Sequence, residues 1–283
     1  MKFASFIVQG RSTYGVVDGD QIIDLEALKP TLGSDLKQAI ANPHLSELSS
    51  EVLAGLPRIA LAQVTFLPVI PNPGKVLCIG INYATHVRET GREMPIYPMI
   101  FTRFADSQTA HLQPIVRPTA SHKLDFEGEL AVVIGKPARH VKQADALEYV
   151  AGYACYNDGS VRDWQKHTIQ FVPGKNFPNT GGFGPWLVTR DEIADPQDLQ
   201  LTTRLNGEVM QHTSTSDMIF DVRQLIEYCS TFTELAPGDV IVSGTTGGVG
   251  AFREPPLWMK PGDTVEVEIS RIGTLRNSIV DEQ

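Results

Sequence analysis

An apolar, β-branched run with two acids at its start constrains the fold of this chain more than any other stretch. Residues Leu130 to Ile134 lie between glycines and predict a buried strand. Glu127 and Glu129 stand two positions apart at its beginning, so both side chains would point to one face. Gly128 leaves the other face bare, which permits close backbone approach. The pair predicts a site for a hard divalent cation, unless the strand begins with two ordinary solvent-facing glutamates.

A third carboxylate fits the pair. The apolar strand expected before Asp158 ends at that residue, and Gly159 follows it. Ligand-binding residues often lie where a strand ends and a loop begins. Asp158 is therefore a candidate third ligand, although an aspartate that caps a helix or a turn would look the same in the sequence.

Two further features are typical of proton transfer and charge stabilisation. His86 and Glu89 are three residues apart on an expected helical turn, so the carboxylate could orient the imidazole as a general base. The alternative is an ordinary surface pair. Lys175 follows a proline and a glycine in a mostly apolar stretch. It is either a buried cation that faces a substrate carboxylate or enolate, or a loop lysine.

A glycine-rich loop, residues 244–250, follows an expected strand over residues 240–243. Such a loop offers backbone N–H groups and hydroxyls, including that of Thr245, to an anion. It matches neither the Walker pattern nor Gly-x-Gly-x-x-Gly, so the sequence does not favour a nucleotide site.

The charge pattern argues against two classes of partner. There are 24 basic and 33 acidic residues, giving a formal net charge of −9, and no basic cluster. We therefore expect neither a nucleic-acid surface nor a membrane-binding surface. No apolar run approaches membrane-spanning length, and the first residues lack a signal-peptide pattern. Cys78, Cys155 and Cys229 are expected to be buried free thiols in a cytoplasmic protein.

The order of elements predicts an α+β, β-rich fold. Residues 1–70 are expected to form a small N-terminal α/β domain with a hairpin turn at Asp18-Gly19, and residues 71–283 a larger catalytic domain. One clear helix is expected from about Asp217 to Phe232, with Ser216 as its N-cap. Otherwise the larger domain consists mainly of short strands, without the strand–helix alternation of a doubly wound sheet.

Taken in order, these motifs resemble those of the fumarylacetoacetate hydrolase family over roughly residues 70–275. Within the family they are similar to the branch of bacterial acylpyruvases and 2-hydroxyhepta-2,4-diene-1,7-dioate isomerases. The resemblance is carried by Gly80-Ile81-Asn82-Tyr83-x-x-His86-x-x-Glu89, Asp125-Phe126-Glu127-Gly128-Glu129-Leu130, Asn157-Asp158-x-Ser160-x-Arg162-Asp163-x-Gln165, Gly174-Lys175, Gly184-Pro185-Trp186 and Gly244-Thr245-x-Gly247-Gly248-Val249-Gly250.

The resemblance implies a mixed β-roll catalytic domain, a homodimer, and Mg²⁺ or Mn²⁺ bound by Glu127, Glu129 and Asp158; Ca²⁺ can take such a site in crystals. It also implies a mobile segment around His86 and Glu89. Some relatives have an aspartate where this chain has Asn82. Other departures, at Thr246 and residues 177–183, leave the substrate more open than the fold.

The implied reaction is hydrolysis of a C–C bond in a β-diketo acid such as an acylpyruvate, through a metal-bound enolate. In this hypothesis His86, oriented by Glu89, activates the attacking water, and Lys175 stabilises negative charge. The residues expected to bind substrate are Thr245, Arg103, Arg162, Gln165 and Tyr83, of which Arg103, Arg162 and Gln165 could instead support the metal ligands.

Two alternatives stay open. The same metal site would serve oxaloacetate decarboxylation, or isomerase, tautomerase, hydratase or lyase chemistry on an unsaturated 2-oxo diacid. A metal-dependent binding protein without catalysis is the third interpretation, although a binder would have little need for the His86–Glu89 pair.

Overall fold

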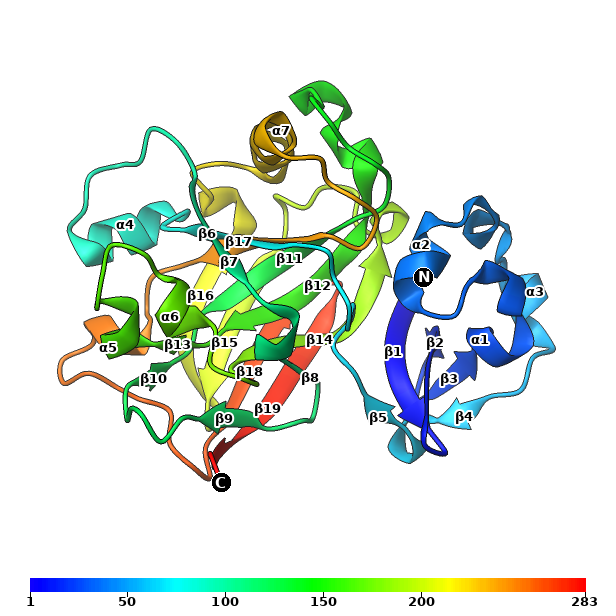
Figure 1. Cartoon of the computed structure of the whole chain (residues 1–283), viewed down its shortest axis with the longest axis horizontal. Helices are drawn as coiled ribbons and strands as arrows, with labels where there is room; N and C mark the ends of the chain where they lie inside the picture. Colours follow the sequence, from blue (N-terminus) through cyan, green and yellow to red (C-terminus); the bar gives the residue numbers. More distant parts are fainter.

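The buried strand predicted from the apolar run is β11, Gly128–Ile134, which lies inside the larger of two main sheets (Figure 1). The computed structural model describes all 283 residues, and its fold is α+β and β-rich, as the sequence predicts. In sheet order the larger sheet contains β4 (Ile59–Ala60), β3 (Gln21–Asp24), β2 (Arg11–Asp18), β1 (Lys2–Val8), β14 (Gly181–Thr189), β12 (Val150–Asp158), β11, β17 (Val240–Thr245), β6 (Val76–Gly80) and β7 (Met99–Arg103), with β5 (Thr65–Phe66) paired to β1 and β8 (Gln108–Ala110) to β14.

The second main sheet packs against the larger one. Its order is β16 (Glu208–Ser214), β15 (Gln200–Leu205), β18 (Thr264–Ile269), β19 (Gly273–Asp281) and β9 (Ile115–Arg117); a separate pair joins β10 (Leu124–Asp125) to β13 (Ser160–Val161). The helices are short: α1 (Leu25–Leu28), α2 (Leu36–Ala41), α3 (Ser50–Ala54), α4 (Ala84–Thr90), α5 (Arg162–Gln165), α6 (Val172–Lys175) and α7 (Val222–Phe232). No helix is both long enough and apolar enough to cross a membrane.

Strand β11 is buried on both faces, which explains why its sequence is continuously apolar rather than alternating. Leu130 and Val132 belong to the core cluster shared with the second sheet and α7. Ala131 and Val133 belong to the cluster shared with the N-terminal elements and β6. Glu129 has the same parity as Ala131, so its side chain lies on the face of the sheet that is turned away from the second sheet.

The N-terminal elements gather at one side of the molecule (blue in Figure 1). The turn predicted at Asp18-Gly19 is confirmed, because Asp18 pairs with Gln21 between β2 and β3. Strand β1 is paired with β14 through Lys2 and Val188, so these strands extend the larger sheet. The division of the chain at residue 70 stays a prediction.

The helical turn and the buried thiols expected from the sequence are confirmed, and the start of one longer helix was predicted wrongly. Helix α4 carries His86 and Glu89 and ends at Thr90, before Gly91, whose φ of 66° is left-handed. The three cysteines are buried and free. The helix expected from Asp217 instead begins at Val222 (α7), and Ser216 is not its cap. Asp221 and Gln224 form a reciprocal capping box, which satisfies more backbone donors than a lone serine and fixes the start of the helix.

One half-buried histidine contributes to the packing between the N-terminal elements and the rest of the chain. The ring of His111 packs edge-on against Phe66, with centroids 5.1 Å apart. Its Nδ1 accepts a hydrogen bond from the backbone N–H of Arg276 at 3.1 Å. Burial, with a smaller effect of the Arg276 charge, lowers the pKa of His111 from 6.5 to about 4.

We therefore expect the fold to lose stability as the pH falls below 6.5, because the unfolded chain binds a proton that His111 in the folded chain does not. At pH 5 this single group would cost about 2 kcal/mol. In His111→Asn the side-chain oxygen can still accept from Arg276, but nothing titrates. Thermal unfolding in EDTA at pH 7.5 and pH 5 should show a smaller loss for the variant than for the wild type. Equal losses would contradict the assignment.

Candidate metal and active site

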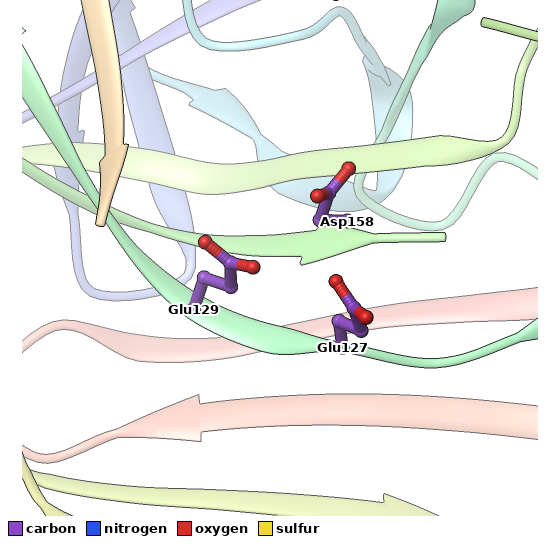
Figure 2. A group of neighbouring side chains, drawn as sticks. All are labelled: Glu127, Glu129 and Asp158. Carbon is purple, nitrogen blue, oxygen red and sulfur yellow. The ribbon is translucent and has the colours of Figure 1, made fainter. Parts of the chain in front are cut away.

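Three carboxylates converge at the edge where β11 begins and β12 ends (Figure 2). Glu127 directly precedes β11, Glu129 lies within it, and Asp158 is the last residue of β12. All three are buried, and one oxygen from each lies within 4.8 Å of the others. The same-face prediction for the two glutamates is confirmed. Gly128 is needed between them, since a Cβ there would lie 2.0 Å from Thr203 Oγ1.

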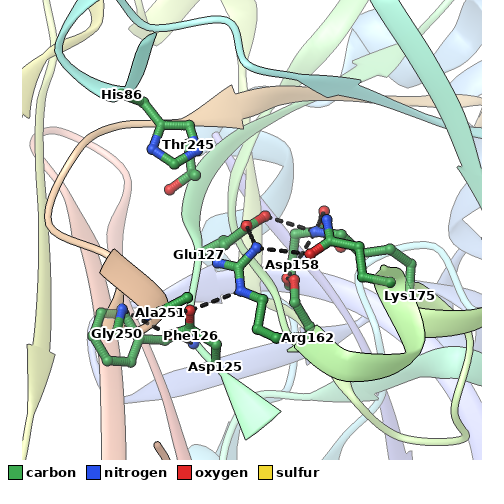
Figure 3. A network of polar contacts seen from close by, with 12 residues as sticks. His86, Asp125, Phe126, Glu127, Asp158, Arg162, Lys175, Thr245, Gly250 and Ala251 are labelled. Carbon is green, nitrogen blue, oxygen red and sulfur yellow. Dashed lines mark hydrogen bonds and ion pairs between the residues drawn. The ribbon is translucent and has the colours of Figure 1, made fainter. Parts of the chain in front are cut away.

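Two of the three acids are each held by two cations, and Figure 3 shows Lys175 and Arg162 beside Glu127. Lys175 Nζ donates to Glu127 Oε2 and to Asp158 Oδ2, both at 2.6 Å. Arg162 Nη1 lies 2.7 Å from Glu127 Oε1, and Arg103 Nη1 donates to Asp158 Oδ1 at 2.6 Å. Lys175 is only 1% exposed, so it is a buried cation and not a loop lysine. Arg103 supports a carboxylate of the site, the second of its two expected roles.

The third acid has no cation beside it. Burial would raise the pKa of Glu127, but the charges of Lys175 and Arg162 outweigh burial and lower it to about 2. Burial and the charges of Asp158 and Glu127 instead raise the pKa of Glu129 well above its ordinary value. Three oxygen donors, one of them a buried carboxylate without a counter-ion, fit a hard divalent cation such as Mg²⁺ or Mn²⁺.

The predicted proton carrier lies across the site from these acids. His86 on α4 is buried, and its Nδ1 is 2.9 Å from Glu89 Oε2. A carboxylate accepts hydrogen bonds, so Nδ1 carries the proton of this bond and Nε2 is left for a reactant. The ring edge packs near Phe252, with centroids 6.0 Å apart. Thr85 fixes α4 from the other side by donating to Asp217 at 2.7 Å.

The glycine-rich loop binds anions, but they are carboxylates of this protein. Its backbone N–H groups donate to three acids from distant parts of the chain: Gly244 to Glu129 at 2.6 Å, Gly248 to Glu89 at 2.8 Å, and Gly250 and Ala251 to Asp125 at 2.8 and 2.9 Å. These N–H groups are therefore engaged within the protein, and the expectation that the loop and Thr245 hold a substrate carboxylate stays a prediction. The Thr245 hydroxyl is also engaged, since it donates to Gly128 O and accepts from Gln211.

A narrow cavity of about 80 Å³ joins these parts. Of the residues expected in the site, its walls contain His86, Glu127, Glu129, Arg162, Gln165 and Thr245. Tyr83 does not reach it. That side chain is fully buried in the apolar core, because the strand-like residue before α4 points inward. The substrate contact expected for Tyr83 is thus not seen.

Asp125 is a functional residue that sequence reasoning missed. It accepts from Arg162 Nε at 2.8 Å, and that arginine then reaches Glu127 (Figure 3). The same carboxylate holds the loop that carries Phe252. The only sequence signal is the first acid of the Asp-Phe-Glu-Gly-Glu motif, which no spacing argument marks.

The Asn82 side chain is bonded to the backbone and is not directed at the metal site. It is fully buried, its side-chain nitrogen donates to Phe220 O and Ser243 O, and its oxygen accepts from Phe220 N. Because all these bonds go to the backbone, the residue joins α4 to β17 and to the segment before α7. An aspartate here would lose both donor contacts.

Comparison with known proteins identifies relatives over most of the chain. The family profile described as fumarylacetoacetate (FAA) hydrolase C-terminal matches residues 75–280. The mitochondrial protein named oxaloacetate tautomerase FAHD2A from cattle (Bos taurus) is 41% identical over 267 residues, covering 93% of this chain and 85% of the relative. That relative is mitochondrial by name; a cytoplasmic location for this chain stays a prediction.

Two solved structures add other reactions. A 2-hydroxyhepta-2,4-diene-1,7-dioate isomerase from Mycobacterium marinum is 30% identical with a TM-score of 0.78, covering 100% of this chain and 99% of its own. A maleylpyruvate hydrolase from Sphingobium sp. SYK-6, in complex with manganese(II) and pyruvate, is 29% identical with a TM-score of 0.83, covering 100% of both chains. These relatives include a tautomerase, an isomerase and a hydrolase, so they do not single out acylpyruvases.

Glu127 is paired with cations and Glu129 is not, so isosteric substitutions of the two should change the thermal stability in opposite directions. A pKa raised by folding destabilises the fold above the ordinary pKa, whereas a lowered pKa stabilises it there. In EDTA at pH 7.5, Glu129→Gln should therefore raise the thermal midpoint. Glu127→Gln should lower it, because two buried cations lose a partner. Both variants should bind Mn²⁺ more weakly, on the order of tenfold or more, by calorimetry. Midpoint shifts of the same sign would contradict this account.

Neighbouring glycines in the loop provide a matched test of its role. Gly248 has a φ of 99°, and a Cβ there would lie 2.3 Å from Met210 O. A Cβ at Gly247 meets nothing closer than 3.4 Å. Gly248→Ala should displace the N–H that holds Glu89 and lower kcat by about 10²-fold, with Mn²⁺ affinity largely kept. Gly247→Ala should remain close to wild type. Equal effects of the two substitutions would argue against the positioning role.

Proposed function

The chain belongs to the fumarylacetoacetate hydrolase family, and we propose that it is a divalent-metal-dependent tautomerase of a small 2-oxo dicarboxylic acid of the oxaloacetate type. The observation that carries this choice is the 41% identity, over 93% of the chain, to a protein named oxaloacetate tautomerase. Tautomerisation is one of the alternatives that the sequence left open, and it replaces the C–C hydrolysis that the motif resemblance implies.

The dimensions and walls of the cavity support a small, polar reactant. A volume of about 80 Å³ leaves little room for a long acyl chain. The carboxylates Glu127 and Glu129 lie on one part of its wall and His86 on another. A compact 2-oxo acid between them would have its carbonyl toward the acids and the adjacent carbon toward the imidazole.

Mg²⁺ or Mn²⁺, held by Glu127, Glu129 and Asp158, would supply a Lewis acid for the 2-oxo group. His86 Nε2 removes a proton from the carbon beside the carbonyl. The C–H electron pair forms the carbon–carbon double bond, and the carbonyl π pair moves onto oxygen. Water gives a proton to that oxygen and takes up the one that the His86 imidazolium releases, which completes the enol and restores the neutral ring; in the other direction the enol proton passes to water and the His86 imidazolium gives its proton to carbon. Glu89 stabilises the imidazolium that forms between these steps.

The arginine and lysine of the site keep its charges in place. Lys175 bridges two of the acids, and Arg162 connects Glu127 to Asp125. Both cations are buried, so they bring positive charge to the site without water to screen it. Lys175 therefore holds the carboxylates in place. Its positive charge would stabilise the negative charge that develops on the substrate nearby.

Hydrolysis of a C–C bond is the second candidate. A specific observation favours it, since a maleylpyruvate hydrolase with a TM-score of 0.83 binds manganese(II) and pyruvate. In that reaction the His86–Glu89 pair would act on water instead of on carbon. Homodimerisation, implied by the motif resemblance, belongs to either proposal.

We expect His86→Ala to lower kcat for the tautomerisation of enol-oxaloacetate by on the order of 10²–10⁴, because the proton carrier is lost. Mn²⁺ affinity should hardly change, since His86 is not one of the three acids. The chain offers a matched control: His44 forms the same i,i+3 pair with Glu47, but on the exposed surface. His44→Ala should leave the rate unchanged. If Mn²⁺ affinity in His86→Ala fell as much as kcat, His86 would not be the proton carrier.

The reaction itself is tested by ultraviolet assays run side by side. Decay of the enol-oxaloacetate band faster than in buffer, abolished by EDTA and restored by Mg²⁺ or Mn²⁺, supports the tautomerase. Cleavage of acylpyruvates to two acids, with enol-oxaloacetate decaying at its uncatalysed rate, would replace it with the hydrolase. Release of CO₂ and pyruvate from oxaloacetate would indicate a decarboxylase. Metal-dependent binding without turnover across the panel would favour a binding protein.

A further inference from the structure

A dicarboxylic substrate needs a partner for its second carboxylate, and the glycine-rich loop does not provide one. The N–H groups of Gly244, Gly248 and Gly250 already donate to acids of the protein. Thr245 donates its hydroxyl to a backbone oxygen. The anion partner must therefore be sought elsewhere on the walls of the same cavity.

Two cations at the cavity wall have no partner. Arg92, just beyond the end of α4, and Lys166, just beyond the end of α5, both line the cavity and are exposed. Neither side chain forms a hydrogen bond or an ion pair, although the chain has 33 acids for 24 bases. Deeper in the same wall, Nη2 of Arg162 is buried without a hydrogen-bond partner. The buried unpaired donor of Arg162, with two free cations on the same cavity wall, indicates an anionic ligand.

We propose that Arg92 and Lys166 form a subsite for the distal carboxylate of a dicarboxylic 2-oxo acid; this deepens the proposed function and rests on it. The substrate would lie with its 2-oxo carboxylate end toward Glu127 and Glu129 and its second carboxylate toward the exposed cations. Arg162, whose Nη2 is buried without a partner, lines the same cavity and would donate to a substrate oxygen.

The location of the two cations would let the subsite orient the substrate relative to His86. Arg92 follows the helix that carries His86, and Lys166 follows the helix that carries Arg162 and Gln165. Helices α4 and α5 lie on the same side of the molecule in Figure 1, and residues of both line the cavity. One carboxylate bound by both cations would connect the two elements and hold the proton carrier against the substrate.

An apolar substrate tail would be a poorer fit. It could pack against Ile81 and Phe252, which also line the cavity. It would then place a hydrocarbon group between two charged side chains and give neither a counter-ion. We therefore expect the subsite to bind a carboxylate in preference to a methyl group at this end of the substrate.

The test measures binding and needs no turnover. L-malate and 2-hydroxybutanoate have the same carbon skeleton length and the same 2-hydroxy acid end, and they differ by a carboxylate in place of a methyl group. We expect the Mn²⁺-loaded wild type to bind L-malate more tightly in calorimetric titration. Arg92→Ala and Lys166→Ala should each weaken L-malate binding by about tenfold, while 2-hydroxybutanoate binding is unchanged.

Two further variants separate charge from packing. Arg92→Lys keeps the charge and should restore most of the preference for L-malate. Arg88→Ala removes an exposed arginine from the same helix, outside the cavity, and should bind both probes as the wild type does. A wild type without preference for L-malate, or variants that weaken both probes equally, would overturn the subsite. A preference that Arg92→Ala and Lys166→Ala abolish would uphold it even if enol-oxaloacetate were not turned over.

Discussion

The structure depends on keeping three negative charges close together inside the protein. Glu127, Glu129 and Asp158 are buried, and like charges at that distance repel strongly where water does not screen them. Three basic side chains compensate two of the acids, and Glu129 is left with a single backbone donor. The fold thus maintains a charge imbalance that is concentrated on one carboxylate and favours a divalent cation at this site.

Such an arrangement needs a rigid frame, and β11 provides it. The strand is buried on both faces and paired on both edges, so Glu129 within it and Glu127 just before it cannot move apart without disrupting two core clusters. The absence of a side chain at Gly128 lets the second sheet approach directly beneath the acids. The loop after β17 completes the frame, since its N–H groups donate to Glu129, to Glu89 and to Asp125.

Sequence reasoning reached the parts of the site that obey local rules. Strand periodicity placed Glu127 and Glu129 on one face, and helical spacing brought Glu89 to His86, because both patterns depend only on backbone geometry. It failed where partners are distant in the chain. The loop around Gly248 looked free because its acceptors lie more than a hundred residues away. Asp125 had no marked spacing, and Tyr83 shares a motif with site residues while pointing into the core.

The shared loop also bears on how such an enzyme could change its substrate over evolution. A displacement of the whole loop would disturb Glu129, the His86–Glu89 pair and Asp125 together, so these three parts constrain one another. The residues just beyond α4 and α5 are not constrained in this way, because the side chains of Arg92 and Lys166 contact no other polar group of the protein. Mutations there can be tried singly without loss of the inner machinery. Divergence between relatives with different substrates would therefore accumulate first at the entrance of the cavity, while the interior is inherited as a unit.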